Sequence, residues 1–216
     1  MRRWGMALTA LGFFCLFAAL LLNVVISCGT NDGIYRELQE ENGLPEAAGV
    51  SQEEMERLDG MLADYLAGDE AALADSPFNE KELAHMRDVL VLFDLARAAR
   101  GILLAAAAAL LVAGLWLARG ARVLAMCLVG LAVLLVPLGA FAAWAAVDFS
   151  SAFTLFHEVL FTNDLWLLDA QTDLLVRLLP EQFFVDIAGV IAVRALAYML
   201  AVPLAVFGVQ FGRRFV

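Results

Sequence analysis

The sequence predicts an all-α membrane protein with four transmembrane helices, a helical extracellular cap and interfacial helices. Three observations predict this class: 62% hydrophobic residues among 216, a mean hydropathy of +0.80 and four long apolar stretches. Soluble domains contain only about 45–50% apolar residues. A helix needs about 20 apolar residues to cross a hydrocarbon core of about 30 Å, and the four stretches approach or exceed that length.

The apolar stretches and the polar segments between them divide the chain into six parts. We expect transmembrane helices at 1–27, 101–118, 122–147 and 187–211, a cap over 28–100 that leads into the second helix, and an interfacial segment over 148–186. The second stretch is short, but Arg97, Arg100 and Arg119 flank it and can extend toward the two interfaces. We therefore keep it as a membrane span.

Positive charges predict the orientation, because short cytoplasmic loops are enriched in Lys and Arg. The cations cluster before the first stretch, between the second and third, and after the fourth, at Arg2, Arg3, Arg119, Arg122, Arg213 and Arg214. This pattern predicts cytoplasmic termini. The 24 carboxylates fall between Asp32 and Asp186, in or beside the segments predicted to lie outside. An acidic exterior argues against a nucleic-acid partner.

The first stretch could alternatively be a cleaved signal, since "VISCG" at 25–29 loosely resembles a lipobox with Cys28 as the lipidated residue. Its apolar run of about 23 residues exceeds the 7–15 of a signal peptide, so we expect it to be retained. Cys15 and Cys127 lie within predicted spans and cannot form a framework with Cys28. No disulfide is predicted.

Two cap helices have start signals. "SQEEMERLDGMLADYLAG" repeats apolar residues at helical spacing from Met55 to Leu66, and Ser51 can cap it with Glu54 in the capping-box position. A second helix should begin near Asn79, with Glu82 three residues on, and continue unbroken into the second span. It carries His85, one of two histidines in the chain.

The other histidine, His157, lies in "AFTLFHEVLFTNDLW" at 152–166, within an aromatic segment of the kind that lies along membrane interfaces. The turn at 162–164 should end its helix, and Pro180 should mark a later break. Both histidines are thus predicted at the outer membrane surface. They could be a proton-transfer pair, or separate residues merely hydrogen-bonded at the interface.

Metal chemistry has little support in the sequence. "HEVLF" lacks the second histidine of HExxH, because Phe161 stands there, and no other metal-ligand spacing occurs. We therefore expect no metal and no cofactor. Asp88 shares a helical face with His85 and could orient its ring.

Two blocks, "FNEKELAHMRDV" and "FHEVLFTNDLWLLDAQTDLLVRLLPEQFFVD", on four spans with an acidic cap after the first, resemble the lipoprotein intramolecular transacylase (Lit) family of Gram-positive bacteria. The cap between Thr30 and Pro77 has no matching motif. The resemblance implies an acyltransferase of the plasma membrane. Its substrate would be a bacterial lipoprotein, whose sn-2 acyl chain moves from the diacylglyceryl group to the α-amino group of the N-terminal cysteine, giving the lyso-form.

The resemblance also implies that His85 and His157 are catalytic, in an aromatic-rich pocket beside membrane lipid. We take His157 as the base and His85 as the acid or oxyanion donor, although the reverse assignment is equally consistent with the chemistry. Candidate substrate-binding residues are Phe153, Phe156, Asn163, Trp166, Asp88 and Arg194.

Arg194 lies inside the fourth predicted span, where a charge usually faces a cavity or a partner. It could hold the oxyanion or a substrate carbonyl, pair with Asp148 or Asp94, or extend to the interface near Asp186.

Two rival functions remain: a non-enzymatic accessory protein that binds a partner through the acidic cap, and a membrane hydrolase or metalloprotease.

Overall fold

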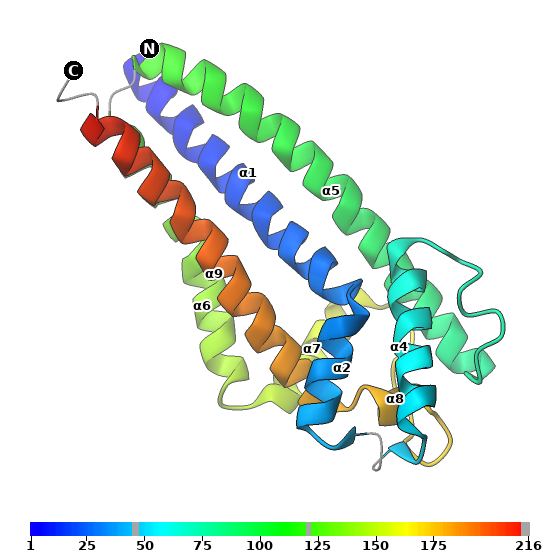
Figure 1. The fold of residues 1–216 in the computed structure, drawn as a ribbon. Coiled ribbons are helices and arrows are strands. Elements are labelled where there is room, and N and C mark those ends of the chain that lie inside the picture. The colour runs from blue at the N-terminus through cyan, green and yellow to red at the C-terminus, as the bar shows by residue number, and fades with distance from the viewer. Residues whose placement is uncertain (45–47, 120–121, 213–216) are drawn as a thin grey trace. The chain divides into compact units, whose positions relative to one another are not determined.

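The computed structural model describes residues 1–44, 48–119 and 122–212, and in these ranges the chain is helical with no strand. Its helices are α1 (Arg2–Gly29), α2 (Asp32–Glu41), α4 (Gln52–Ala67), α5 (Glu80–Ala118), α6 (Val123–Ala145), α7 (Phe149–Leu160), α8 (Leu175–Leu178) and α9 (Glu181–Gly212) (Figure 1). Of these, α1, α5, α6 and α9 are long and apolar enough to cross a membrane, which confirms the predicted class. The predicted cations Arg213 and Arg214 lie outside the described residues.

The chain folds into two compact units. The membrane unit comprises Met1–Val24, Ala96–Ala143 and Ala192–Val216, and the cap unit comprises Val25–Leu95 and Trp144–Ile191. Each long helix therefore contributes one part to each unit. The membrane unit contains most of the apolar stretches, and the cap unit contains both histidines.

Within the membrane unit, α1 packs closely against α5 and α6 through glycines. A Cβ atom built on Gly114 of α5 would lie 2.6 Å from the backbone nitrogen and Oγ1 of Thr9. One built on Gly130 of α6 would lie 2.7 Å from the carbonyl oxygen of Ala10. Small residues allow such close approach between helices in lipid, where packing replaces the hydrophobic effect as the driving force.

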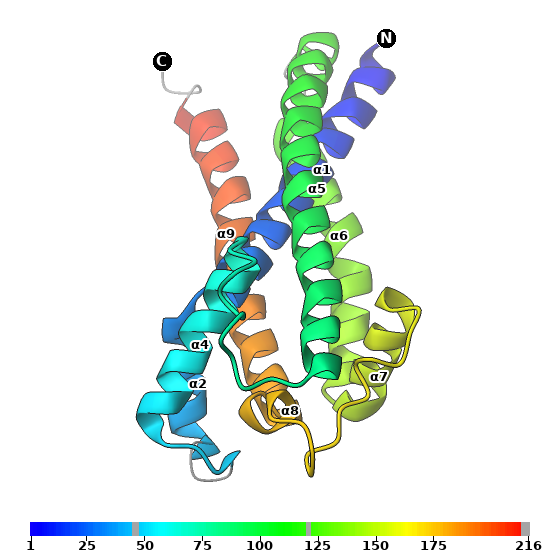
Figure 2. The same ribbon diagram turned by 90° about the vertical axis from the view of Figure 1, so that its right-hand side faces the viewer.

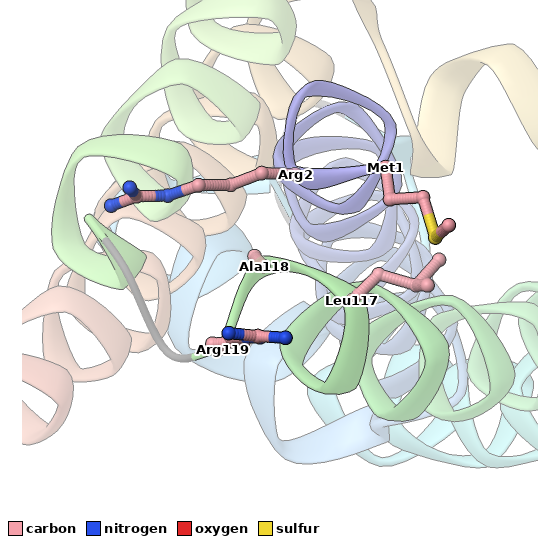
Figure 3. A pocket seen from close by; sticks show the side chains of 5 residues that line it. All are labelled: Met1, Arg2, Leu117, Ala118 and Arg119. Carbon is pink, nitrogen blue, oxygen red and sulfur yellow. The ribbon is translucent and has the colours of Figure 1, made fainter.

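The first turn of α1 lies beside the last turn of α5 (Figures 1 and 2), since a Cβ on Gly5 would collide with Leu117 and Ala118. Figure 3 shows a pocket at this end of the membrane unit, lined by Met1, Arg2, Leu117, Ala118 and Arg119. Two of the predicted cytoplasmic cations, Arg2 and Arg119, thus lie at the same end of the unit.

The cap unit is built around α2 and α4, which pack side by side (Figure 2). The Ser51 side chain accepts a hydrogen bond from the Glu54 nitrogen at 3.2 Å, which confirms the predicted cap of α4. The Glu54 carboxylate accepts from Arg57. The predicted apolar face is buried: Met55, Leu58, Leu62 and Leu66 are at most 6% exposed.

Helices α1 and α9 extend beyond the predicted spans, α6 is shorter than its predicted span of 122–147, and α2 was not predicted. Its signal was present, because Asn31 caps it and Ile34, Tyr35 and Leu38 form its buried face. Helix α1 continues to Gly29, which places the fully buried Cys28 in its last turn. Helix α9 begins at Glu181, directly after Pro180, because a helix can start in polar residues before its apolar stretch begins.

Candidate active site

His85 lies near the start of α5, whose first turn is fixed by Asn79. The Asn79 side-chain oxygen accepts hydrogen bonds from the nitrogens of Lys81 and Glu82, at 2.9 and 3.1 Å, which confirms the predicted cap. The 39 residues of α5 extend over roughly 58 Å at 1.5 Å per residue, about twice a hydrocarbon core. Charged residues continue as far as Arg100, so His85 precedes the continuous apolar part of α5.

His157 lies in the last turn of α7. Asp148 caps the start of this helix by accepting a hydrogen bond from the Ser151 nitrogen at 3.0 Å. At the other end Phe161 turns into extended backbone, and its N–H donates to the His157 carbonyl at 2.8 Å. Because a carbonyl oxygen only accepts, the contact of 2.7 Å between His157 Nδ1 and the Phe153 oxygen requires a proton on Nδ1.

The two imidazole rings lie close together. Their centroids are 6.2 Å apart, although the residues come from different helices. Both side chains are buried, with 9% of His85 and 7% of His157 exposed. The centroid of Phe161 lies 5.2 Å from the ring of His85 and 5.6 Å from that of His157. Phe161 therefore contacts both histidines and joins them into one cluster.

Three more aromatic rings surround His157. The centroid distances to His157 are 4.2 Å for Phe153, 5.4 Å for Phe156 and 4.8 Å for Trp166, which is stacked on the imidazole. Phe153 and Phe156 come from α7, and Trp166 comes from the segment that follows it. The structure thus places the three aromatic candidates for substrate binding around His157.

Burial among these rings favours neutral imidazoles. Desolvation lowers the pKa of His157, and the hydrogen bond to Phe153 offsets part of this effect. Desolvation also lowers the pKa of His85, to about 4; His157 contributes to the decrease, and Asp88 opposes it. Both histidines are therefore predominantly uncharged at neutral pH.

Asp88 makes no hydrogen bond to His85 Nδ1, which is buried without a hydrogen-bond partner, and its role in orienting the ring stays a prediction. The Asp88 carboxylate instead accepts a hydrogen bond of 2.9 Å from Asn163 Nδ2. The Asn163 oxygen in turn accepts from the Leu165 nitrogen at 3.1 Å. These two candidates therefore link α5 to the turn that leads to Trp166.

Sequence reasoning missed the role of Phe161, although a signal was available. In the sequence, Phe161 stands out only as the residue that interrupts HExxH. It follows His157 by four positions, a spacing that on a helix brings two side chains close together. Among the described residues, no group of three or more His, Cys, Asp or Glu side chains is arranged to hold a metal ion.

Arg194 lies on α9 in the membrane unit, whereas both histidines belong to the cap unit. Its side chain is exposed in the isolated chain. Asp148, one suggested partner, caps α7, and Asp186, near which Arg194 could extend, accepts hydrogen bonds from Asn42 and Gln182. The role of Arg194 remains a prediction.

Fold and site together define a class: a membrane-integral helical protein with two buried histidines in an aromatic cluster. The model of the family "Lipoprotein intramolecular transacylase Lit" matches residues 9–184, which is most of the chain. The chain belongs to this family, and it is accordingly a membrane acyltransferase that modifies lipoproteins.

Solved structures of the same family share the fold. The membrane-integral lipoprotein intramolecular transacylase Lit from Bacillus cereus superposes with a TM-score of 0.81 at 19% identity, over 99% of each chain. A variant of that protein with arginine in place of a histidine gives 0.77 at 18% identity, over 97% of this chain and 93% of the other. A variant with alanine at a histidine gives 0.75 at 19%, over 97% and 94%. No curated protein matches the chain in sequence.

Proposed function

We propose that His157 and His85 catalyse the transfer of an acyl chain from the sn-2 oxygen of the diacylglyceryl group to the α-amino group of the lipoprotein's N-terminal cysteine. The observation that carries this proposal is the hydrogen bond of 2.7 Å between His157 Nδ1 and the Phe153 carbonyl, within a cluster that contains both imidazoles. The product is the lyso-form lipoprotein, with a free sn-2 hydroxyl and an amide at the cysteine nitrogen.

His157 is the general base. With its proton held on Nδ1 by Phe153, the neutral ring carries its lone pair on Nε2. Nε2 takes a proton from the cysteine amine as the amine attacks the ester carbon. The proton returns to the glyceryl oxygen when the carbon–oxygen bond breaks. One amide forms and one ester bond is lost, so the reaction consumes no external proton.

His85 is a neutral hydrogen-bond donor to the oxyanion of the tetrahedral intermediate. Its Nδ1 is buried without a partner, and a buried acceptor is left unpaired more readily than a buried N–H. This favours the tautomer with hydrogen on Nε2. A pKa lowered to about 4 keeps the ring uncharged, so it stabilises developing negative charge as an aligned dipole.

The aromatic side chains orient the substrate. Amine nitrogen, two cysteine carbons, sulfur, two glyceryl carbons, oxygen and the acyl carbon close an eight-membered ring, which forms poorly in a flexible molecule. Orientation in a rigid site can contribute about 7–11 kcal/mol in favourable cases. Phe153, Phe156 and Trp166 would confine this ring, while Asp88 and Asn163 hold the adjoining turn. Exclusion of water by the same rings would suppress hydrolysis of the ester.

The proposed orientation has both termini in the cytoplasm and the cap unit outside. Arg2 and Arg119 lie at one end of the membrane unit, as the positive-inside pattern requires. The site then lies where membrane lipid surrounds the acyl chains and water reaches the cysteine head group. Arg194 is a secondary candidate for contact with a substrate carbonyl.

The test is the lyso-form fraction of a reporter lipoprotein, measured by mass spectrometry after co-expression in a host without this activity. We expect His157→Gln and His85→Asn each to reduce the rate by about 10²- to 10⁴-fold, with normal insertion into the membrane. Glu158→Gln is the matched control, because Glu158 is adjacent to His157 but exposed. The double variant should be little worse than the more damaging single variant.

Full activity of His157→Gln would contradict the mechanism. Free fatty acid as the product would indicate a hydrolase, and activity abolished by a chelator and restored by zinc would indicate a metalloenzyme. An accessory protein would tolerate loss of both histidines and depend on charges of the cap.

A further inference from the structure

Glu82 is a buried carboxylate one turn before His85 in α5. Its side chain is only 1% exposed, although glutamate is seldom fully buried without partners. Its two oxygens accept backbone hydrogen bonds, Oε2 from the Asn79 nitrogen at 2.7 Å and Oε1 from the Leu175 nitrogen at 2.5 Å. The first bond completes the capping box, and the second reaches 93 residues along the chain.

Further hydrogen bonds connect the same turn of α5 to the segment before α8. Asn79 Nδ2 donates to Asp173 Oδ1 at 2.9 Å, and the other Asp173 oxygen accepts from the Asp169 nitrogen at 2.7 Å. Lys81 Nζ donates to the Leu167 carbonyl. The first turn of α5 therefore holds residues 167–175 at several separate points.

This segment begins one residue after Trp166, whose indole is stacked on His157. We infer that Glu82 is a positioning residue for the transacylation: by binding the Leu175 and Asn79 nitrogens, it holds the Trp166 segment against the helix that carries His85, and so keeps both imidazoles desolvated. Glu82 itself contacts neither histidine and no reacting atom. Only the expected change in the pH–rate profile rests on the proposed function.

A carboxylate suits this place better than the isosteric amide. Two backbone N–H groups require two acceptors, and hydrogen bonds to an ionised group are about twice as strong as neutral ones. In Glu82→Gln an NH₂ group replaces one oxygen, so it faces the backbone N–H of either Asn79 or Leu175, and two donors cannot form a hydrogen bond. One contact is therefore lost, and a buried donor remains unsatisfied. The segment that carries Trp166 should loosen, and water should reach the rings.

The experiment is a histidine titration by NMR on the whole protein in detergent, with ¹³C-labelled histidine. The chain contains two histidines, so two resonances are expected, and His85→Asn assigns them. Asp88 is the charged group that acts on His85, and it is retained in all variants tested. In Glu82→Gln we expect the pKa of His157, and that of His85, to rise toward the ordinary value of about 6.5.

Glu80→Gln is the matched control, since it removes the same charge from the same helical turn at an exposed position, and it should leave both titrations unchanged. In the pH–rate profile, the acid limb of Glu82→Gln should move to higher pH. A variant that merely reduced the amount of folded protein would lower the rate without moving that limb.

If Glu82→Gln does not yield folded protein, Asn79→Ala tests the same connection, because it removes the link to Asp173 together with the Asn79 cap of α5 and leaves the Glu82 carboxylate in place. The expected shift has the same direction and is smaller. Unchanged histidine titrations in a folded Glu82→Gln or Asn79→Ala variant would overturn the inference. The NMR result does not depend on activity, so full activity of His157→Gln would refute the proposed function while leaving the positioning role intact.

Discussion

His157 Nδ1 lies 2.7 Å from the carbonyl oxygen of Phe153, one turn earlier in the same helix. The partner is a backbone atom, so the tautomer of His157 is set by the fold of α7 and not by another ionisable side chain.

Acid should destabilise the cap unit through His85. Its pKa in the folded protein is about 4 against an ordinary 6.5, so the unfolded chain binds more protons between these values. The stability contributed by the neutral ring is complete above pH 6.5 and is lost as pH falls through about 4. His85→Asn should flatten the thermal unfolding profile in this window. An unchanged slope would show that His85 is not desolvated.

Asp59 should have the opposite dependence. Burial raises its pKa from 3.8 to about 7, so stability is greatest below pH 3.8 and is lost as pH rises through 7. Gln39 Nε2 donates to Asp59 Oδ1 at 3.0 Å, while Asp59 Oδ2 and Gln39 Oε1 are buried without partners. If Asp59 Oδ2 is protonated, it can donate a second hydrogen bond to Gln39 Oε1, so that two hydrogen bonds join α2 and α4.

Asp59→Asn places an NH₂ group where the protonated oxygen would donate. We expect it to stabilise the protein at pH 8 by about 1–3 kcal/mol, the cost of an unsatisfied buried polar group, and to remove the pH dependence between 4 and 7. The charged groups acting on Asp59 are Arg36, Asp32 and Glu56, which the variant retains. Thermal unfolding of both proteins across this range is the measurement, and a variant less stable than the wild type at pH 8 would contradict the pairing.

Gly114 should tolerate no side chain, because a Cβ there would lie 2.6 Å from two atoms of Thr9. We expect Gly114→Ala to destabilise the packing of α1 on α5 by about 1–3 kcal/mol. Gly101→Ala is the control: it lies in the same helix with no atom within 4 Å of its Cβ, and it should be neutral or stabilising by up to about 1 kcal/mol. Equal unfolding temperatures for the two variants would argue against this helix contact.

The proposed orientation predicts that a cysteine at Glu54 reacts with an impermeant maleimide in intact protoplasts, whereas one at Gly120 does not. Glu54 is on α4, and Gly120, which lies outside the described residues, separates α5 from α6 in the sequence. The native Cys15, Cys28 and Cys127 are buried, so background labelling should be low. Labelling of Gly120→Cys from outside would contradict the proposed orientation and indicate the opposite one.

Local signals in the sequence determined the class and several helix starts. Apolar stretches near 20 residues predicted four spans because hydrocarbon thickness sets that length. Ser51 and Asn79 marked helix starts because a cap needs only groups within three residues. The same signals at Asn31 would have revealed α2. Hydropathy placed the fourth span at 187, but it could not mark the polar first turn of α9 from Glu181.

Tertiary structure decided everything that depends on contact between distant residues. Four contacts join segments whose separation no helical period encodes: Phe161 with His85, Glu82 with Leu175, Gln39 with Asp59, and Asn163 with Asp88. The histidine pKa values follow from the same packing, because an imidazole titrates near 6.5 in water and is shifted only by the neighbours that exclude water from it. The sequence identified the two histidines as candidates, and their packed environment determines their charge and tautomers.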